Sequence, residues 1–313
     1  MLVLQGASGK LGFATLSALI EHNLLSPSEI TVTTSSDSGA SKLQPFVDRG
    51  VKLAHVSWDS PVSDWTTVLR GADSLYLISS ARIDKDFGFA EPGKGREADH
   101  FVALKAAKEA GVGHVYYTSL AFANPSKSRV MKAHERTEEY LHQEWPGKFT
   151  ILREGLYNES WPLYLGHYDV PNDDRTEVVT AGDGKIAWTS IPDLGLANAL
   201  VLSDPVKDWA GKTFYLSQSR SLTLKEVAAL VSKAKEKQIK HKVVSRDEHE
   251  KFYTQERKMP QPMIEWWART YDALEDGECE IKDPTLEKLL ARKGKKATSM
   301  EATVHEMLAA SSK

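Results

Sequence analysis

Three glycines near the start of the chain are the residues whose spacing points most directly to chemistry. Gly6, Gly9 and Gly12 recur at every third position, after the apolar run Met1–Leu4 and at the start of a helix-like segment. In a strand–turn–helix unit the first glycine permits a tight turn, the second lets a phosphate approach the backbone, and the third lets helix and strand pack closely. The helix N–H groups would then face the phosphates. We expect a pyrophosphate-binding turn rather than a ligand-free one, with these contacts: Gly6, Ala7, Ser8, Gly9, Lys10, Leu11 and Gly12.

Polar side chains follow the next strand-like runs, where a dinucleotide would continue. Thr34 and Ser35 end the second run and are expected at the adenosine ribose, and Asp59 follows the third run, at the adenine. Ser79 and Ser80 end the fourth run and are expected beneath the nicotinamide and its ribose. Carboxyl ends of parallel strands share one edge of a sheet, so these groups should lie together.

The cofactor's phosphate state is not settled by the residues alone. No acid directly follows the second run to bind a ribose 2′-hydroxyl, and no arginine follows it to bind a 2′-phosphate. Lys10 and Lys42 could supply charge to a phosphate, although Lys42 could equally be a solvated lysine. Asp37 mildly favours the unphosphorylated form.

Aromatic and polar residues beyond the later strands suggest a substrate site. Tyr157, Trp161 and Tyr164 follow the sixth run, and aromatic walls suit a flat, conjugated molecule. Arg82 in the long loop 80–95 could meet a carbonyl or anionic group, although a solvated arginine is the alternative. Ser119 ends the fifth run and could orient a substrate carbonyl, or it could bond to backbone.

Strand-like and helix-like segments alternate along the first half of the chain, which positions these residues. This order predicts an α/β fold with a doubly wound parallel Rossmann sheet. Residues 1–155 should form the dinucleotide-binding core. Residues 156–313 should return partly to it and form a smaller C-terminal helical substrate lobe. In that second part we expect short strands at 177–180 and 186–189, joined by a turn at 182–184, a strand at 212–216, and a set of helices that build the lobe, at 224–237, 247–257, 262–274, 285–291 and 299–308.

Composition excludes several function classes. The 313 residues are 41% hydrophobic and 27% charged, with net charge −3. The chain therefore lacks the excess of basic residues that nucleic-acid-binding proteins use. No apolar run reaches the length of a membrane span, and no signal-peptide core is present. The single cysteine, Cys279, excludes disulfides within one chain, and the histidines show no metal-ligand spacing. We expect a cytoplasmic protein without metal; the oligomeric state stays open.

Several motifs together resemble the NmrA-like branch of the atypical short-chain dehydrogenases/reductases. They are the glycine turn, the fifth-strand stretch 110–119 (AGVGHVYYTS), the stretch 133–138 (AHERTE) and the stretch 150–157 (TILREGLY). The likeness is strongest to the NADPH-dependent quinone reductases of that family. It implies an NAD(P)-binding fold and favours NADP(H) over NAD(H). The family also includes redox-sensing regulators that bind the dinucleotide without turning it over.

The resemblance also draws attention to a missing catalytic group. The broader superfamily commonly uses a tyrosine and a lysine four residues apart, and here these positions are Ser128 and Lys132. A serine hydroxyl is a far weaker acid than a phenol, which disfavours simple ketone reduction. The resemblance suggests that Lys132 holds the nicotinamide ribose or acts as an acid/base; a surface lysine is the alternative. His134, two residues on, is a second candidate, or a packing histidine.

We therefore expect an NAD(P)H-dependent reductase that passes hydride to a conjugated acceptor such as a quinone, enone or imine. Such acceptors spread charge through their π-system and need less help from a protein acid. Lys132, His134 and Ser119 are the expected catalytic residues. The main alternative is a non-catalytic NAD(P)-binding redox sensor of the NmrA type. A dinucleotide-using isomerase or epimerase is disfavoured by the missing tyrosine.

Overall fold

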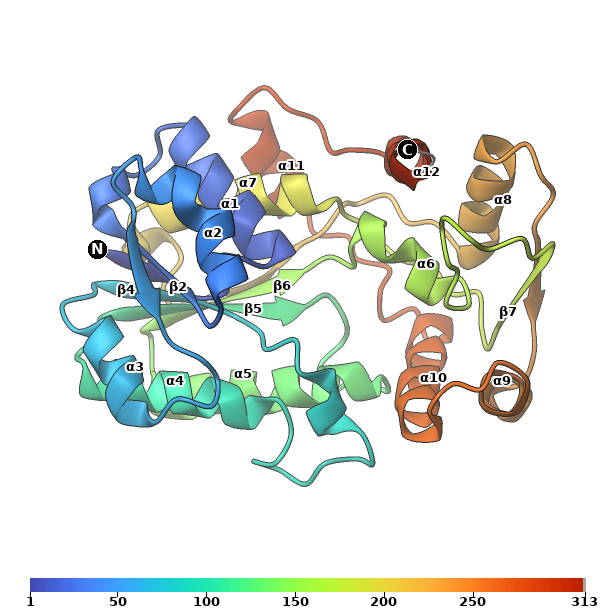
Figure 1. The fold of residues 1–313 in the computed structure, drawn as a ribbon, viewed down its shortest axis with the longest axis horizontal. Helices are drawn as coiled ribbons and strands as arrows, with labels where there is room; N and C mark the ends of the chain where they lie inside the picture. The colour runs from blue at the N-terminus through green and yellow to red at the C-terminus, as the bar shows by residue number, and fades with distance from the viewer. Residues whose placement is uncertain (312–313) are drawn as a thin grey trace.

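The computed structural model describes residues 1–311 and contains a seven-stranded, entirely parallel sheet (Figure 1). The spatial order of its strands is β3-β2-β1-β4-β5-β6-β8, so the order reverses direction between β1 and β4. That reversal is the switch point at which doubly wound sheets bind ligands. The predicted fold class is therefore confirmed, with these strands: β1 Leu2–Leu4, β2 Ile30–Thr34, β3 Lys52–His55, β4 Ser74–Ile78, β5 His114–Leu120, β6 Phe149–Glu154 and β8 Thr213–Leu216.

Helices cover both faces of the sheet (Figure 1). One face carries α1 (Lys10–Glu21), α2 (Asp37–Val47), α7 (Ile191–Ser203) and α11 (Thr285–Ala291). The other carries α3 (Val62–Leu69), α4 (Glu97–Glu109) and α5 (Lys132–Glu144). Every residue of β1 and β2 is buried, as strands covered on both faces require.

The remaining chain forms a lobe beyond the carboxyl edge of the sheet (Figure 1). Its apolar core contains Trp161, Trp188 and Tyr271. β8 and the helices α7 and α11 come from the same half of the sequence but pack with the sheet, so the chain crosses between the two parts repeatedly. The boundary at residue 155 therefore stays a prediction. The lobe elements are α6 Trp161–Tyr164, β7 Glu177–Thr180, α8 Leu224–Ala234, β9 Lys240–Val243, α9 Arg246–Lys251, α10 Gln261–Glu275 and α12 Met300–Ser311.

Two expectations about this second half are wrong. The strand predicted at 177–180 is present as β7 and pairs in parallel with β9, but the strand predicted at 186–189 does not form, since these residues make only isolated bridges. Gly184 instead lies so close to the Leu274 carbonyl that any side chain would overlap it, and the turn packs against the end of α10. In addition, α11 packs on α7 and β8 rather than in the lobe.

No helix within residues 1–311 is long and apolar enough to cross a membrane. In the same part of the chain, no group of three or more His, Cys, Asp or Glu side chains is placed to hold a metal ion.

The helices α1 and α7 pack unusually close together. A Cβ atom built on Gly195 of α7 would lie 2.6 Å from the Cβ atom of Ala14 in α1 and 2.7 Å from its carbonyl carbon. Since real Cβ atoms do not approach so closely, glycine alone permits this helix spacing.

We expect Gly195→Ala to lower the free energy of unfolding by about 1–3 kcal/mol, because the added methyl group must push the two helices apart. Urea denaturation measures this change. Ser203→Ala at the end of the same helix adds no bulk and serves as the control. An unchanged midpoint for Gly195→Ala would contradict the packing described.

Candidate active site

The glycine turn lines a cavity of about 330 Å³ at the carboxyl edge of the sheet. Gly6 has φ +79°, a conformation that other residues adopt only with strain, and its carbonyl accepts the Gly9 N–H at 3.0 Å. A side chain at Gly12 would overlap the Gly6 backbone, so the third glycine lets α1 approach the strand as expected.

The start of α1 is open to an anionic ligand. Gly9 is its N-cap residue, and no side chain caps the helix. The N–H groups of the first turn therefore lack intrahelical partners and face the cavity. Lys10 and Ser8 also line this cavity, and Lys42 donates to the Ser8 carbonyl oxygen at 2.9 Å. This cradle fits a pyrophosphate.

Thr34 and Ser35 at the end of β2 line the same cavity. A side chain at Gly39 of α2 would overlap the Thr34 hydroxyl, which shows how closely α2 packs there. No carboxylate lines the cavity within residues 1–311, so nothing in the described wall opposes a further phosphate.

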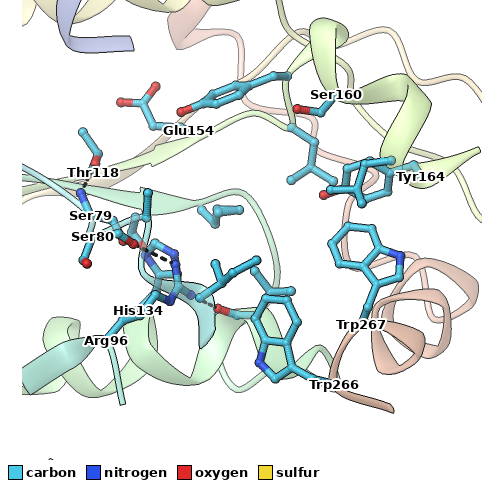
Figure 2. A pocket seen from close by; sticks show the side chains of 18 of the residues that line it. Ser79, Ser80, Arg96, Thr118, His134, Glu154, Ser160, Tyr164, Trp266 and Trp267 are labelled. Atoms are coloured by element: carbon cyan, nitrogen blue, oxygen red, sulfur yellow. Dashed lines mark hydrogen bonds between the residues drawn. The ribbon is translucent and has the colours of Figure 1, made fainter. Parts of the chain in front are cut away.

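A second, larger cavity of about 460 Å³ adjoins the first (Figure 2). The two share Ile78, Ser79, Ala81 and Tyr157 in their walls and thus form one crevice at the switch point of the sheet. Residues expected from the sequence at this second cavity and found in its wall are Ser79, Ser80, Ser119, His134, Tyr157 and Tyr164.

The lobe supplies the apolar wall of the larger cavity. Tyr164 of α6 meets Trp267 of α10 edge to face, with ring centroids 4.9 Å apart, and Trp266 stands beside them (Figure 2). Met259 and Met263 add thioether surface. Aromatic rings and methionines suit a flat apolar ligand.

Arg96 holds the floor of this cavity together. Its buried guanidinium donates to Asp86 at 2.6 Å, to the Ser80 carbonyl at 3.2 Å and to the Val130 carbonyl at 2.9 Å. It therefore joins the end of β4, the following loop and the segment before α5. All its charge is compensated within the protein.

His134 presents an unused ring nitrogen in the wall of the cavity (Figure 2). The side chain is buried, its Nδ1 lies 3.0 Å from the Tyr117 hydroxyl, and its Nε2 has no partner within residues 1–311. Burial, with Arg96 and His100 nearby, holds the pKa of His134 well below its usual value. The imidazole is neutral at pH 7, and its Nε2 atom can form one hydrogen bond to a ligand.

Ser119 is in the wall, but its hydroxyl is committed. It donates to Glu138 of α5 at 2.6 Å, and the same carboxylate accepts a hydrogen bond from the Arg153 guanidinium at 2.6 Å. The structure thus gives Ser119 a structural bond to a side chain rather than to backbone.

Besides Ala7, four expected contacts lie outside both cavities. Lys132 is about one-third exposed and pairs with Glu135 at 2.5 Å, on the outer side of α5. Its assignment as a ribose or catalytic contact stays a prediction that this geometry does not support. Trp161 is fully buried in the lobe core.

Arg82 and Asp59 are the other two, and they bind each other. The Arg82 guanidinium donates to Asp59 at 2.6 Å and to Asp99 at 3.0 Å. Hydrogen bonding and charge from Arg82 lower the pKa of Asp59. Arg82 is thus held by two carboxylates, while the Asp59 side chain stays largely exposed outside the cavity. Ala7, expected at the phosphates, is fully buried behind the turn.

Sequence reasoning missed two charged residues of the larger cavity, Arg96 and Glu154. Arg96 opens α4 and looks in sequence like an ordinary helix-end arginine. Glu154 ends β6 and is 2% exposed. An acid two residues beyond the apolar run FTIL was the available signal for Glu154, because burial there is expected for strand residues.

A doubly wound parallel sheet with a glycine turn and an apolar cavity at its switch point defines a dinucleotide-binding α/β protein of the Rossmann type. The chain belongs to the NmrA-like family, whose family model matches residues 1–308.

Several relatives within this class are oxidoreductases. The chain is 28% identical over 249 residues to the NmrA-like family domain-containing oxidoreductase flvB of Aspergillus flavus, covering 79% of this chain and 75% of that one. Its structure resembles the NADPH complex of the NADPH-dependent quinone oxidoreductase of Escherichia coli, with TM-score 0.81, 26% identity and 98% and 99% of the two chains covered. It also resembles the NADP(H) complex of Citrobacter sp. triphenylmethane reductase, with TM-score 0.78, 26% identity and 98% and 100% covered. The family prediction and the oxidoreductase class are confirmed.

The neutral histidines make stability depend on pH. The folded pKa of His134 lies below the ordinary value of 6.5, so the unfolded chain takes up the proton first as pH falls. Wild-type stability should therefore be present above about pH 6.5 and decline below it, at no more than about 1.4 kcal/mol per pH unit for each such histidine.

We expect His134→Gln, which cannot titrate, to show a shallower decline in the urea midpoint between pH 7 and pH 5. The exposed His305→Gln is the control and should keep the wild-type slope. Equal slopes for wild type and His134→Gln would contradict the neutral, buried state of this imidazole.

Proposed function

We propose that this oxidoreductase transfers hydride from NADPH to a neutral, flat, conjugated acceptor of the quinone type. The observation that carries the proposal is the aromatic-walled cavity of about 460 Å³ that opens directly into the glycine cavity through Ile78, Ser79, Ala81 and Tyr157. A dinucleotide with its pyrophosphate at the glycine turn brings its nicotinamide toward this junction. A non-catalytic sensor has no need of such a second cavity.

NADP(H) is the cofactor. The glycine cavity has an uncapped helix start, two lysines at its rim and no described carboxylate in its wall. Such a wall accommodates the extra 2′-phosphate, whereas an acid after β2 would favour the 2′-hydroxyl. Both related structures described above hold the phosphorylated dinucleotide.

Charge in the larger cavity argues for a neutral acceptor. Among the described residues, Arg96 is the one permanently charged side chain in the wall, and Asp86 neutralises it. His134 and His167 are held neutral by burial, which lowers the pKa of His167 to about 4. An anionic substrate would find no free cation there, and rings packed between tryptophans and methionines bind well.

His134 would assist hydride transfer as a hydrogen-bond donor. The bound NADPH supplies the hydride. If the Tyr117 hydroxyl donates to Nδ1, the Nε2 atom carries the proton, and this N–H has no other partner within residues 1–311. A neutral imidazole placed in this way stabilises negative charge that develops on an acceptor oxygen. Burial holds Tyr117 protonated, since it raises the pKa of the phenol.

We expect purified protein to oxidise NADPH when a 1,4-naphthoquinone is added, with a clear preference for NADPH over NADH. Absorbance of the reduced nicotinamide follows the reaction. A panel of quinones, enones and imines that leaves NADPH unoxidised, although the protein binds it, would contradict the enzyme and favour the sensor.

We expect Gly9→Val to weaken NADPH binding at least about tenfold, because the new side chain occupies the phosphate cradle. Gly9 has φ −75°, which valine tolerates, so the unfolding midpoint should stay near wild type. Fluorescence titration with NADPH measures the affinity.

Gly113→Val is a matched control for this variant. Its added Cβ atom would lie 3.2 Å from a backbone carbonyl oxygen, as at Gly9, but at the amino edge of the sheet before β5. It should leave NADPH affinity unchanged. Equal losses in both variants would show that disturbed folding, not the cradle, is responsible.

A further inference from the structure

The wall of the larger cavity continues to the protein surface as apolar side chains. Ile83, in the segment after β4, and Leu163 of α6 both line the cavity, and each residue is 39% exposed. Trp266 and Trp267 line the same cavity but are only 3% and 5% exposed (Figure 2). The contrast places the tryptophans deep in the cavity, and Ile83 and Leu163 where it opens to solvent.

Two methionines extend the apolar wall from the tryptophans. Met259 and Met263 line the cavity and are half-buried. Met263 precedes Trp266 and Trp267 by three and four residues in α10, so the three side chains share one face of that helix. Thioether side chains are flexible and adapt to ligands of irregular shape. The described wall is therefore predominantly apolar from the tryptophans to the opening.

No charged side chain of the described wall lies at the opening. The charged or acidic residues of that wall are Arg96 and Glu154, which are 4% and 2% exposed and thus lie in the protein interior. A charged substituent would lose hydration at the opening without gaining a counter-ion, whereas an apolar one has no such cost. Accessible apolar surface around a cavity is typical of ligand-binding grooves.

We propose that Ile83, Leu163, Met259 and Met263 form an alkyl subsite, which binds an apolar substituent of the acceptor. The preferred substrates are then quinones that carry an alkyl or alkenyl chain. This inference rests on the proposed function and names its substrate class. The conjugated ring lies against the aromatic residues, and the chain leaves the cavity across the alkyl subsite. The occupant is part of the substrate because the subsite is continuous with the cavity that holds the ring.

The test compares two acceptors with the same ring chemistry. 2-Methyl-1,4-naphthoquinone and 2-hexyl-1,4-naphthoquinone both carry a simple alkyl group, so hydride transfer to their rings is equally demanding. Full burial of a methylene group raises affinity about fourfold, and a subsite open to solvent on one side should give about twofold. At saturating NADPH, the wild-type kcat/KM should therefore be about 30-fold higher for the hexyl compound, which has five more methylene groups.

Leu163→Ser removes apolar surface from the opening and leaves the lobe core intact, because the residue is exposed. It should lower the hexyl-to-methyl ratio of kcat/KM about fivefold, since the chain loses its contact with the isobutyl group. Ile83→Ser should lower the ratio as well. A general defect in folding or in hydride transfer would slow both acceptors and leave the ratio unchanged.

Val206→Ser is the matched control. Val206 is 42% exposed, follows α7 and lines neither cavity. Its replacement should leave the hexyl-to-methyl ratio at the wild-type value. A ratio that falls as much in Val206→Ser as in Leu163→Ser would reflect surface hydrophobicity in general and would contradict the alkyl subsite.

The remaining results also have definite meanings. If the wild type reduces both naphthoquinones with equal kcat/KM, the alkyl subsite is refuted while the reductase stands. If it oxidises NADPH with neither, the proposed function fails, and the inference fails with it. If sedimentation velocity shows that Leu163→Ser and Ile83→Ser convert a dimer into monomers, the opening is an interface between copies of this chain and the inference is overturned.

Discussion

The crevice depends on one buried ion pair, Arg96 with Asp86. An isolated buried charge would be severely destabilising, so the guanidinium uses every available acceptor around it. Those acceptors belong to the end of β4, the loop after it and the segment before α5. Three otherwise independent stretches of chain are thereby fixed at the carboxyl edge of the sheet. Burial, and after it this positive charge, lowers the pKa values of His134 and His100 and keeps both imidazoles neutral.

The sheet and the lobe supply different parts of the site because their positions are determined in different ways. Parallel strands end at a common edge, and this places the glycine turn beside the ends of β2 and β4 without further specification. The lobe needs no such regularity, because it only covers that edge. Its core residues Tyr164, Trp266 and Trp267 pack on one another and expose what remains of their surface to the cavity. The lobe thus supplies the aromatic wall of the larger cavity, while the sheet supplies the glycine turn.

The sequence reveals local features of this molecule well and long-range ones poorly. Glycine spacing and β-branched runs are set by nearest neighbours, so the turn at Gly6–Gly12 and the six strands of the first half could be predicted. The pairing of β7 with β9 joins segments about sixty residues apart, and no local pattern encodes it. The assignments of Lys132 and Arg82 stay predictions for a related reason. A spacing indicates which residues lie near an edge, but partners such as Glu135 and Asp99 decide where a long charged side chain points. Glu154 was overlooked because an acid ordinarily lies at the surface.

The charged and titratable groups described in the wall of the larger cavity are either paired or held neutral. Arg96 is neutralised by Asp86, the histidines are held uncharged by burial, and Glu154 has no cation to ionise against. A cavity arranged in this way binds an uncharged ring readily and resists the appearance of negative charge on it. Hydride transfer creates such a charge, so the reaction is favourable only where the acceptor delocalises it or the wall removes it. A conjugated acceptor satisfies the first condition, and the hydrogen bond proposed for His134 would serve the second.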